Sequence, residues 1–198
     1  MEHRMGGCAN EGAAIAAFAP DSILSAGLVY AGSIDEGADM DGTSGFGDFD
    51  FLVGEWHIAN ERLRERLKGS GDWEFFAATS KVEKVMPIPG GEHFGGNLDQ
   101  MFIPDKGFIG MTLRLYDPAA GLWSIYWSDT KSHRLFPPTV GRFEAGRGIF
   151  FGDDVEGGVP VRVRFDWTAG ENPVWEQSMS ADGGATWEKN WVMRFSRL

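Results

Sequence analysis

The sequence predicts an all-β protein: an antiparallel up-and-down β-barrel of eight to ten strands that follows a flexible N-terminal segment. The chain contains 28 glycines, 15 phenylalanines and 8 tryptophans, a composition that favours strands and tight turns. From Phe49 onward, about ten short runs of strand-forming residues follow one another, separated by turn residues. A meander of this length protects its edges best by closing on itself, and a two-sheet sandwich is the alternative fold.

Residues that favour turns set the boundaries of these runs. The segment Asp117–Gly121 places proline where its φ is compatible and glycine where φ can be positive. Asp182-Gly183, between two alternating runs, is the strongest hairpin signal in the chain. The expected strands, in order, are Gly54–Leu67, Trp73–Met86, Glu92–Ile103, Phe108–Tyr116, Trp123–Ser128, Val140–Glu144, Ile149–Asp153, Val159–Trp167, Val174–Ser180 and Thr186–Ser196.

Two of the expected strands contain irregular stretches. The composition of Asn60–Lys68 favours a helix, but its leucines fit neither period well and it continues directly from Trp56 and Ile58. We therefore assign it to the first strand. In the third strand, Gly95-Gly96 predicts a bulge or a bend.

Acidic residues concentrate at the N-terminal end of the chain. Residues 1–48 contain one basic and eight acidic residues, a net charge of −7, whereas residues 49–198 contain 17 basic and 21 acidic residues, a net charge of −4. All eight tryptophans lie from Trp56 onward. We therefore expect an acidic, Gly/Ala-rich, flexible segment over residues 1–47, or at most a short helix around Pro20–Tyr30, and a barrel domain over residues 48–198.

Charge, cysteine and histidine content narrow the classes of partner. A net charge of −11 disfavours nucleic acid, because domains that bind it normally carry the opposite sign. The single Cys8 cannot form an intramolecular disulfide, and the four histidines lack ligand spacing, so we expect neither a metal nor a cofactor. No apolar run is long enough to predict a membrane span and no signal peptide is evident, so the expected localisation is cytoplasmic. The sequence leaves open whether the protein forms a homodimer.

The first expected strand opens with a motif that resembles a known signature. Gly54-Glu55-Trp56, within Phe49–Trp56, is similar to the Gly-x-Trp of the lipocalin, or calycin, superfamily. The chain also resembles uncharacterised bacterial lipocalin-like proteins that share this opening, a Tyr-Asp-Pro-Ala turn before a Trp-rich strand, and a closing Asp-Gly-Gly-x-Thr-Trp-Glu hairpin. The corresponding segments here are Tyr116–Ala119 and Asp182–Glu188.

This resemblance covers roughly residues 49–198 and implies a calycin-like barrel. It further implies that Trp56 plugs the base of the barrel and that an arginine of the last strand packs over the indole ring, a cation–π contact. We assign that arginine to Arg194. The resemblance carries over no catalytic residue.

The alternation of the first strand gives the sharpest cavity hypothesis. If Trp56 faces inward, then Ile58, Asn60, Arg62 and Arg64 share its face. Asn60 and Arg62 would then need hydrogen-bond partners inside the barrel, or a ligand. They are therefore candidate ligand-binding residues.

Other strands add candidates, with alternatives that the pattern leaves open. In Val159–Trp167, either the apolar set lines the interior and the arginines are solvated, or Arg164 points inward and binds a carboxylate or phosphate. The tryptophans of Trp123–Ser128 suit both a small-molecule pocket and an ordinary core. Asp153-Asp154 is expected to be a solvated turn at a strand end. The further candidate ligand-binding residues are Arg114, Tyr126, Trp127, Arg164 and Glu176.

These patterns favour a binding module, a barrel that holds a small, largely apolar or aromatic molecule. The alternative is a cofactor-independent enzyme, an isomerase, cyclase or hydrolase acting on a small metabolite inside the barrel. The polar groups it would use are Asn60, Arg62, Tyr126, Arg164 and Glu176.

Overall fold

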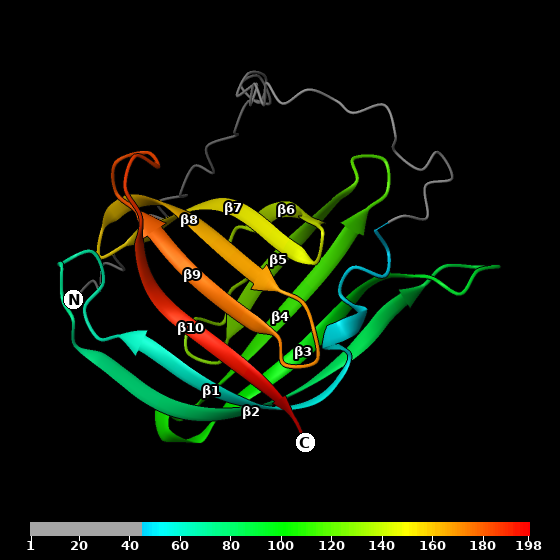
Figure 1. Cartoon of the computed structure of the whole chain (residues 1–198), viewed down its shortest axis with the longest axis horizontal. Coiled ribbons are helices and arrows are strands. Elements are labelled where there is room, and N and C mark those ends of the chain that lie inside the picture. Colours follow the sequence, from blue (N-terminus) through cyan, green and yellow to red (C-terminus); the bar gives the residue numbers. More distant parts are fainter. Residues whose placement is uncertain (1–44) are drawn as a thin grey trace, which may run out of the picture. The chain divides into compact units, whose positions relative to one another are not determined.

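Ten antiparallel strands close into one barrel in the computed structural model, which describes residues 45–198 (Figure 1). Each strand pairs with its neighbours in sequence, and β1 pairs with β10 to complete the ring. The predicted up-and-down barrel is therefore confirmed and the sandwich is excluded. The strands are β1 (Gly54–Leu63), β2 (Trp73–Pro87), β3 (Phe94–Ile103), β4 (Phe108–Asp117), β5 (Leu122–Asp129), β6 (Thr139–Glu144), β7 (Arg147–Glu156), β8 (Val159–Thr168), β9 (Val174–Ser180) and β10 (Glu188–Arg197).

The N-terminal segment predicted to be flexible lies almost wholly outside the described residues. The same holds for the short helix considered around Pro20–Tyr30. From residue 45 the chain packs against the barrel: the Phe46 ring lies 4.7 Å from that of Tyr116, and Phe49 is buried.

Two expected strand ends and the expected bulge differ from the structure. β1 ends at Leu63 rather than Leu67, because the chain bends over residues 64–68 and Leu67 adopts a φ of 58°. The register of β2 with β3 runs without a shift past Gly95-Gly96, so no bulge forms there. β7 continues to Glu156, which turns the expected Asp153-Asp154 turn into strand.

A register shift does occur between β9 and β10. It lies between Lys189 and Trp191, so Asn190 has no Cα partner on β9. Asn190 is nevertheless fully buried, and its Oδ1 accepts a hydrogen bond from Gln177 Nε2 at 2.8 Å. The bulge therefore brings a polar residue into the interior beside Trp191.

One end of the barrel is filled by an aromatic core. The 3₁₀ turn η1 (Asp50–Leu52), cyan in Figure 1, lies at this end, and the β1–β2 connection lies at the opposite end. Phe49, just before η1, is 1% exposed and makes edge contacts with Trp123 and Phe143 at centroid distances of 5.0 and 4.9 Å. Leu52, Phe150 and Trp167 complete this core.

The closure of this end depends on Trp56 and the last residues of β10. Trp56 Nε1 donates to Leu52 O at 2.7 Å, and the Arg197 guanidinium lies 3.8 Å from the indole centroid. Arg197 also donates to Val53 O at 2.7 Å and to Phe51 O at 3.1 Å. Gly54 has a φ of 125°, and a side chain there would collide with Arg197 Nη1, which explains the glycine of the Gly-x-Trp motif.

The assignment of Arg194 to this closure is therefore wrong. Arg194 is the register partner of Ala59 and faces outward, where it forms an ion pair with Glu61 at 3.2 Å. Arg197 is the register partner of Trp56 and shares its face. The two arginines differ by three positions, and a strand turns its side chain over at each odd step.

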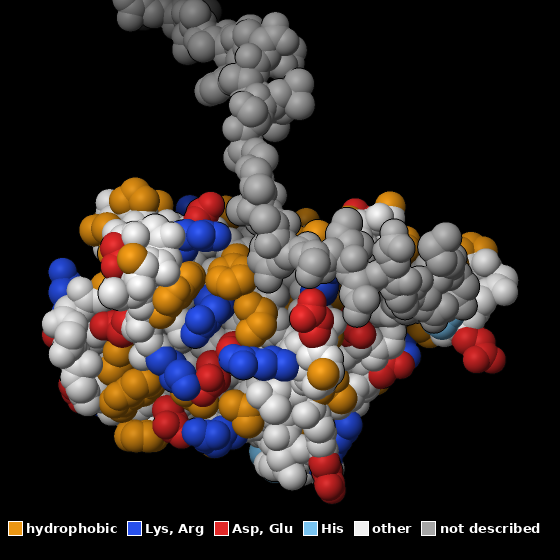
Figure 2. Space-filling model, turned by 45° about the horizontal axis from the view of Figure 1, so that its top comes forward, with side chains coloured by type: hydrophobic (Ala, Val, Ile, Leu, Met, Phe, Trp, Pro, Cys, Tyr) orange, Lys and Arg blue, Asp and Glu red, His pale blue; other side chains and the backbone are white. Residues whose placement is uncertain are grey.

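The outer surface carries both signs of charge. Figure 2 shows Lys and Arg side chains interspersed with Asp and Glu and with hydrophobic side chains on the face turned to the viewer.

Within residues 45–198 the helical elements are η1 and η2 (Pro104–Lys106), both far too short to cross a membrane as helices.

Candidate functional site

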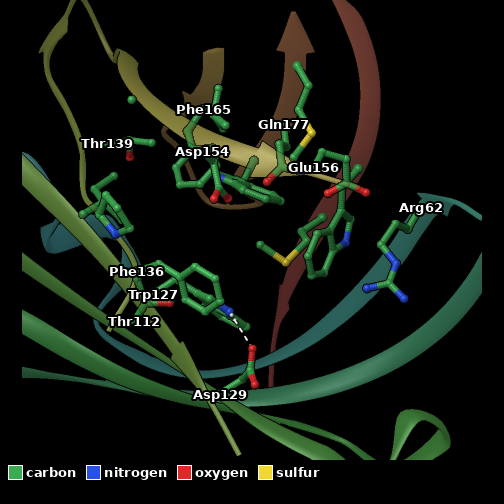
Figure 3. Close-up of a pocket in the computed structure, with 18 of the residues that line it drawn as sticks. Arg62, Thr112, Trp127, Asp129, Phe136, Thr139, Asp154, Glu156, Phe165 and Gln177 are labelled. Atoms are coloured by element: carbon green, nitrogen blue, oxygen red, sulfur yellow. Dashed lines mark hydrogen bonds between the residues drawn. The ribbon is translucent and has the colours of Figure 1, made fainter. Parts of the chain in front are cut away.

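A cavity of about 310 Å³ lies inside the barrel (Figure 3). It reaches from the aromatic core, where Trp167 and Arg114 line it, to the ends of β5 and β7, where Asp129 and Glu156 line it. The volume is within the range of small-molecule sites. The aromatic residues that line it are Phe108, Trp127, Phe136, Phe165, Trp167, Trp175 and Trp191.

The inward face of β1 supplies Asn60 and Arg62, as the alternation predicted, and the protein itself provides their partners. Asn60 Oδ1 accepts from Trp191 Nε1 at 2.9 Å, and Asn60 is 2% exposed. Arg62 donates from Nε and Nη2 to Glu74 Oε1 at 3.0 and 2.7 Å. Its guanidinium also lies 5.1 Å from the Trp191 centroid. Arg62 lines the cavity wall and its charge is compensated by Glu74.

Glu74 is shared among several cations. Lys106 Nζ lies 2.6 Å and Arg64 Nη1 3.3 Å from its Oε2, opposite the contacts of Arg62 with Oε1. The hydrogen bond from Lys106, opposed by burial and reinforced by Arg62, lowers the pKa of Glu74. The carboxylate is therefore ionised at neutral pH, and it fixes Arg62 against the cavity wall.

A second ion pair is buried deeper in the barrel. Arg114 Nη1 donates to Asp99 Oδ1 at 2.7 Å and to Asn97 Oδ1 at 2.9 Å, and Ser80 Oγ lies 3.2 Å from Asp99 Oδ2. The Arg114 guanidinium lies 5.4 and 5.7 Å from the ring centroids of Phe49 and Trp167. Its charge is therefore neutralised where the cavity meets the core.

Strand β7 contributes carboxylates to the cavity lining. Asp154 and Glu156 lie on the inward face of β7, which they share with Phe150 and Gly152 (Figure 3). Glu156 forms an ion pair with Arg66 at 3.0 Å, whereas Asp154 accepts a hydrogen bond from the backbone N–H of Val155 at 2.8 Å.

Asp129, at the end of β5, is a further carboxylate of the lining and lies across the cavity from Asp154 in Figure 3. It accepts hydrogen bonds from Trp127 Nε1 at 3.2 Å and from the backbone N–H groups of Lys131 and Ser132 at 2.9 and 2.7 Å. Burial raises the pKa of Asp129, but the hydrogen bonds from Ser132, Lys131 and Trp127 outweigh it and hold the pKa below its usual value. This part of the lining therefore remains negatively charged at neutral pH.

Three buried polar atoms of the lining have no hydrogen-bond partner among residues 45–198. They are Arg114 Nε, Trp167 Nε1 and Thr139 Oγ1, on side chains from β4, β8 and β6. Each residue is more than nine-tenths buried. An unsatisfied buried donor costs about 1–3 kcal/mol, and these three atoms lie beneath the accessible surface of the lining.

The structure divides the predicted ligand-binding residues into two groups. Arg62, Arg114 and Trp127 line the cavity, and Asn60 lies on the inward face beside Trp191. The cavity lining does not include Tyr126, Arg164 or Glu176, because the residues that alternate with them on their strands line the cavity instead.

These three face outward, so the hypothesis that Arg164 points into the barrel is wrong. Its guanidinium lies 5.1 Å from the Trp187 ring on the outer side of β8, and Glu176 forms an ion pair with Lys189 at 2.6 Å. The apolar alternate residues of β8, Val163, Phe165 and Trp167, line the interior instead.

Several residues of the cavity lining were not predicted from the sequence. Asp154 and Glu156 were readable from their parity with Phe150, but ending the strand at Asp153 concealed it. Thr139 begins β6 directly after Pro137-Pro138, and Gln177 lies between Glu176 and Ser178 on β9, so neither carries a distinctive signal.

No protein-family model matches the chain, and no curated protein matches it either. Within residues 45–198 no group of three or more His, Cys, Asp or Glu side chains could hold a metal ion.

Proposed function

We propose that this chain is a lipocalin-like binding protein that holds a small, largely apolar or aromatic molecule inside its barrel. The observation that carries the proposal is the cavity of about 310 Å³ with seven aromatic residues in its lining. Ligand sites combine such apolar walls with a few placed polar groups, which Arg62, Arg114 and Thr139 supply here.

The contacts of the charged residues favour binding of a largely apolar molecule. The guanidinium groups of Arg62, Arg66 and Arg114 each lie within 3.0 Å of a carboxylate of the protein. An apolar molecule can therefore enter without breaking an ion pair. The closure of the opposite end by Trp56 and Arg197 supports the likeness to lipocalins, because it repeats the expected arrangement with the arginine three positions further on.

The enzyme alternative has less support. Of the five polar residues it would use, Tyr126, Arg164 and Glu176 lie on the outer face, and Asn60 and Arg62 are engaged by Trp191 and Glu74. Binding is therefore the function we put forward.

The test uses the neutral fluorophore N-phenyl-1-naphthylamine, whose emission rises in apolar surroundings. Val163→Trp places a large side chain in the cavity, and Tyr126→Trp is the matched control because it adds a tryptophan to the outer face. We expect the wild type and Tyr126→Trp to bind alike and Val163→Trp to bind at least about tenfold more weakly, the effect of losing about 1.4 kcal/mol.

Circular dichroism and thermal unfolding establish that both variants fold. Equal binding by a folded Val163→Trp would place the fluorophore outside the barrel and refute the cavity as the site. No binding to the wild type would refute the proposed function.

A further inference from the structure

We infer that the ligand is an organic cation, an aromatic molecule with a protonated amine, and that this amine pairs with the carboxylate of Asp154. The inference rests on the proposed function and specifies the chemical class of the ligand. It begins from the polar groups of the cavity lining that keep accessible surface and have no partner of opposite character in the protein.

Asp154 is a carboxylate of the lining that the protein does not compensate. It lies on the inward face of β7 and is partly exposed, and its one hydrogen bond within residues 45–198 comes from the backbone N–H of Val155. Its acidic neighbour on the same face, Glu156, has the guanidinium of Arg66 at 3.0 Å. Asp154 has no such cation among the described residues, so its negative charge is left for a ligand.

Gln177 adds a second free acceptor to the lining. It is 7% exposed, and its Nε2 donates to Asn190 Oδ1, which leaves Oε1 directed away from Asn190. Oε1 accepts no hydrogen bond within residues 45–198, yet it keeps accessible surface. In Figure 3 the side chains of Gln177 and Asp154 both point into the cavity, across from Trp127 and Phe136. An acceptor left unpaired in a cavity costs free energy, which a ligand that donates hydrogen bonds recovers.

The other charges of the lining also favour a cation over an anion. The guanidinium groups of Arg62, Arg66 and Arg114 are each paired with a carboxylate of the protein. Asp129 remains ionised at neutral pH and forms no ion pair within residues 45–198. The charges of the lining that lack a partner are therefore negative, so they attract a cation and repel an anion.

The aromatic walls suit a cation as well. The fold already places the guanidinium of Arg62 over the ring of Trp191, 5.1 Å from its centroid. The rings of Trp127, Phe165 and Trp175 also line the cavity, and no Lys or Arg side chain of residues 45–198 lies over them. Their faces can therefore receive both the aromatic body and the positive charge of a ligand.

Three naphthalenes with different substituents test the sign of the ligand's charge. 2-(Aminomethyl)naphthalene is a cation at neutral pH, 2-ethylnaphthalene replaces its ammonium group by a methyl group, and 2-naphthoate is an anion. Each is measured by displacement of N-phenyl-1-naphthylamine from the full-length protein. We expect the amine to bind at least about tenfold more tightly than 2-ethylnaphthalene, the effect of one hydrogen bond to a charged group, and naphthoate to bind most weakly.

Variants at Asp154 test the partner of the amine. Asp154→Asn removes the charge at constant shape, Asp154→Lys reverses it, and Glu61→Gln is the matched control because it removes a carboxylate of the outer face. We expect the ratio of the affinities for amine and 2-ethylnaphthalene to fall about tenfold in Asp154→Asn and to stay unchanged in Glu61→Gln. In Asp154→Lys, naphthoate should bind more tightly than the amine. The ratio cancels changes in cavity size, and circular dichroism establishes that each variant folds.

Equal affinity of the wild type for the amine and 2-ethylnaphthalene, or tighter binding of naphthoate than of the amine, would overturn the inference. A preference for the amine that survives in Asp154→Asn, or that falls equally in Glu61→Gln, would overturn it too, because Asp154 would not be the partner. In each of these cases N-phenyl-1-naphthylamine still binds, and the proposed function stands. Failure of the fluorophore itself to bind would remove both.

Discussion

Replacement of Arg197 by methionine tests the closure of the barrel most directly. Arg197→Met keeps the length of the side chain but removes the guanidinium that lies 3.8 Å from the Trp56 centroid. It also removes the hydrogen bonds to Val53 O at 2.7 Å and Phe51 O at 3.1 Å. Arg194→Met is the matched control on the same strand.

The expected magnitudes follow from these contacts. An exposed cation–π contact contributes about 0.5–1 kcal/mol, and each hydrogen bond adds about 0.5–1 kcal/mol because the carbonyls regain water when the donor is lost. We therefore expect Arg197→Met to lower the free energy of unfolding by about 2 kcal/mol. Arg194 and Glu61 form an exposed ion pair, so Arg194→Met should lower it by less than about 1 kcal/mol.

Urea unfolding followed by tryptophan fluorescence measures both variants. With a slope of about 2 kcal/mol/M, the midpoint for Arg197→Met should fall by about 1 M, and the midpoint for Arg194→Met by less than half of that. Equal losses in the two variants would contradict the register argument that places Arg197, and not Arg194, over Trp56. A loss below about 0.5 kcal/mol for Arg197→Met would contradict the energetic argument.

Two further predictions concern the ion pairs around the cavity. Arg114→Met should lower the free energy of unfolding by about 3–5 kcal/mol, because it leaves Asp99 buried without its cation. In urea unfolding, the double variant Arg114→Met/Asp99→Leu should recover much of this loss. If it recovers none, the charge left on Asp99 is not the cause of the loss. Glu74→Gln should lower the free energy of unfolding by about 2–3 kcal/mol at pH 7, less than for a fully buried pair because Arg62 and Lys106 are about one-quarter exposed. The folded-state pKa of Glu74 is below the unfolded value of about 4.3. The difference in free energy of unfolding between wild type and Glu74→Gln should therefore be constant above about pH 6 and shrink as the pH falls through the folded-state pKa. A difference that stays the same from pH 3 to 8 would contradict the role assigned to the ionised Glu74 carboxylate.

The strands of this barrel could be predicted because each is a local pattern. β8 alternates Val163, Phe165 and Trp167 with arginine and aspartate, and the structure turns the apolar set inward. The face of β1 that carries Trp56, Asn60 and Arg62 follows from one parity rule, which holds to the end of the strand. Strand ends were less predictable, since the bends after Leu63 depend on Leu67 packing against the cluster of Val161, Val163 and Met179.

The partners of polar residues could not be predicted, because they come from distant parts of the chain. Nothing near Arg62 in the sequence identifies Glu74 or Lys106, and nothing near Asn60 identifies Trp191. For the same reason the contact with Trp56 was assigned to Arg194 instead of Arg197. The choice between these two arginines requires the register of β10 against β1.

The sequence by itself predicted the antiparallel strands and the inward parity of most of them, because hydrophobic alternation and turn chemistry act between near neighbours. It favoured a closed barrel over a sandwich, and the tryptophan-plugged end was implied only by the resemblance to lipocalins. Only the tertiary structure decided which charges are compensated and which buried donors are left without a partner. Hydrogen bonds and ion pairs are short-ranged and directional, so they are fixed only when the strands are set in register around the barrel.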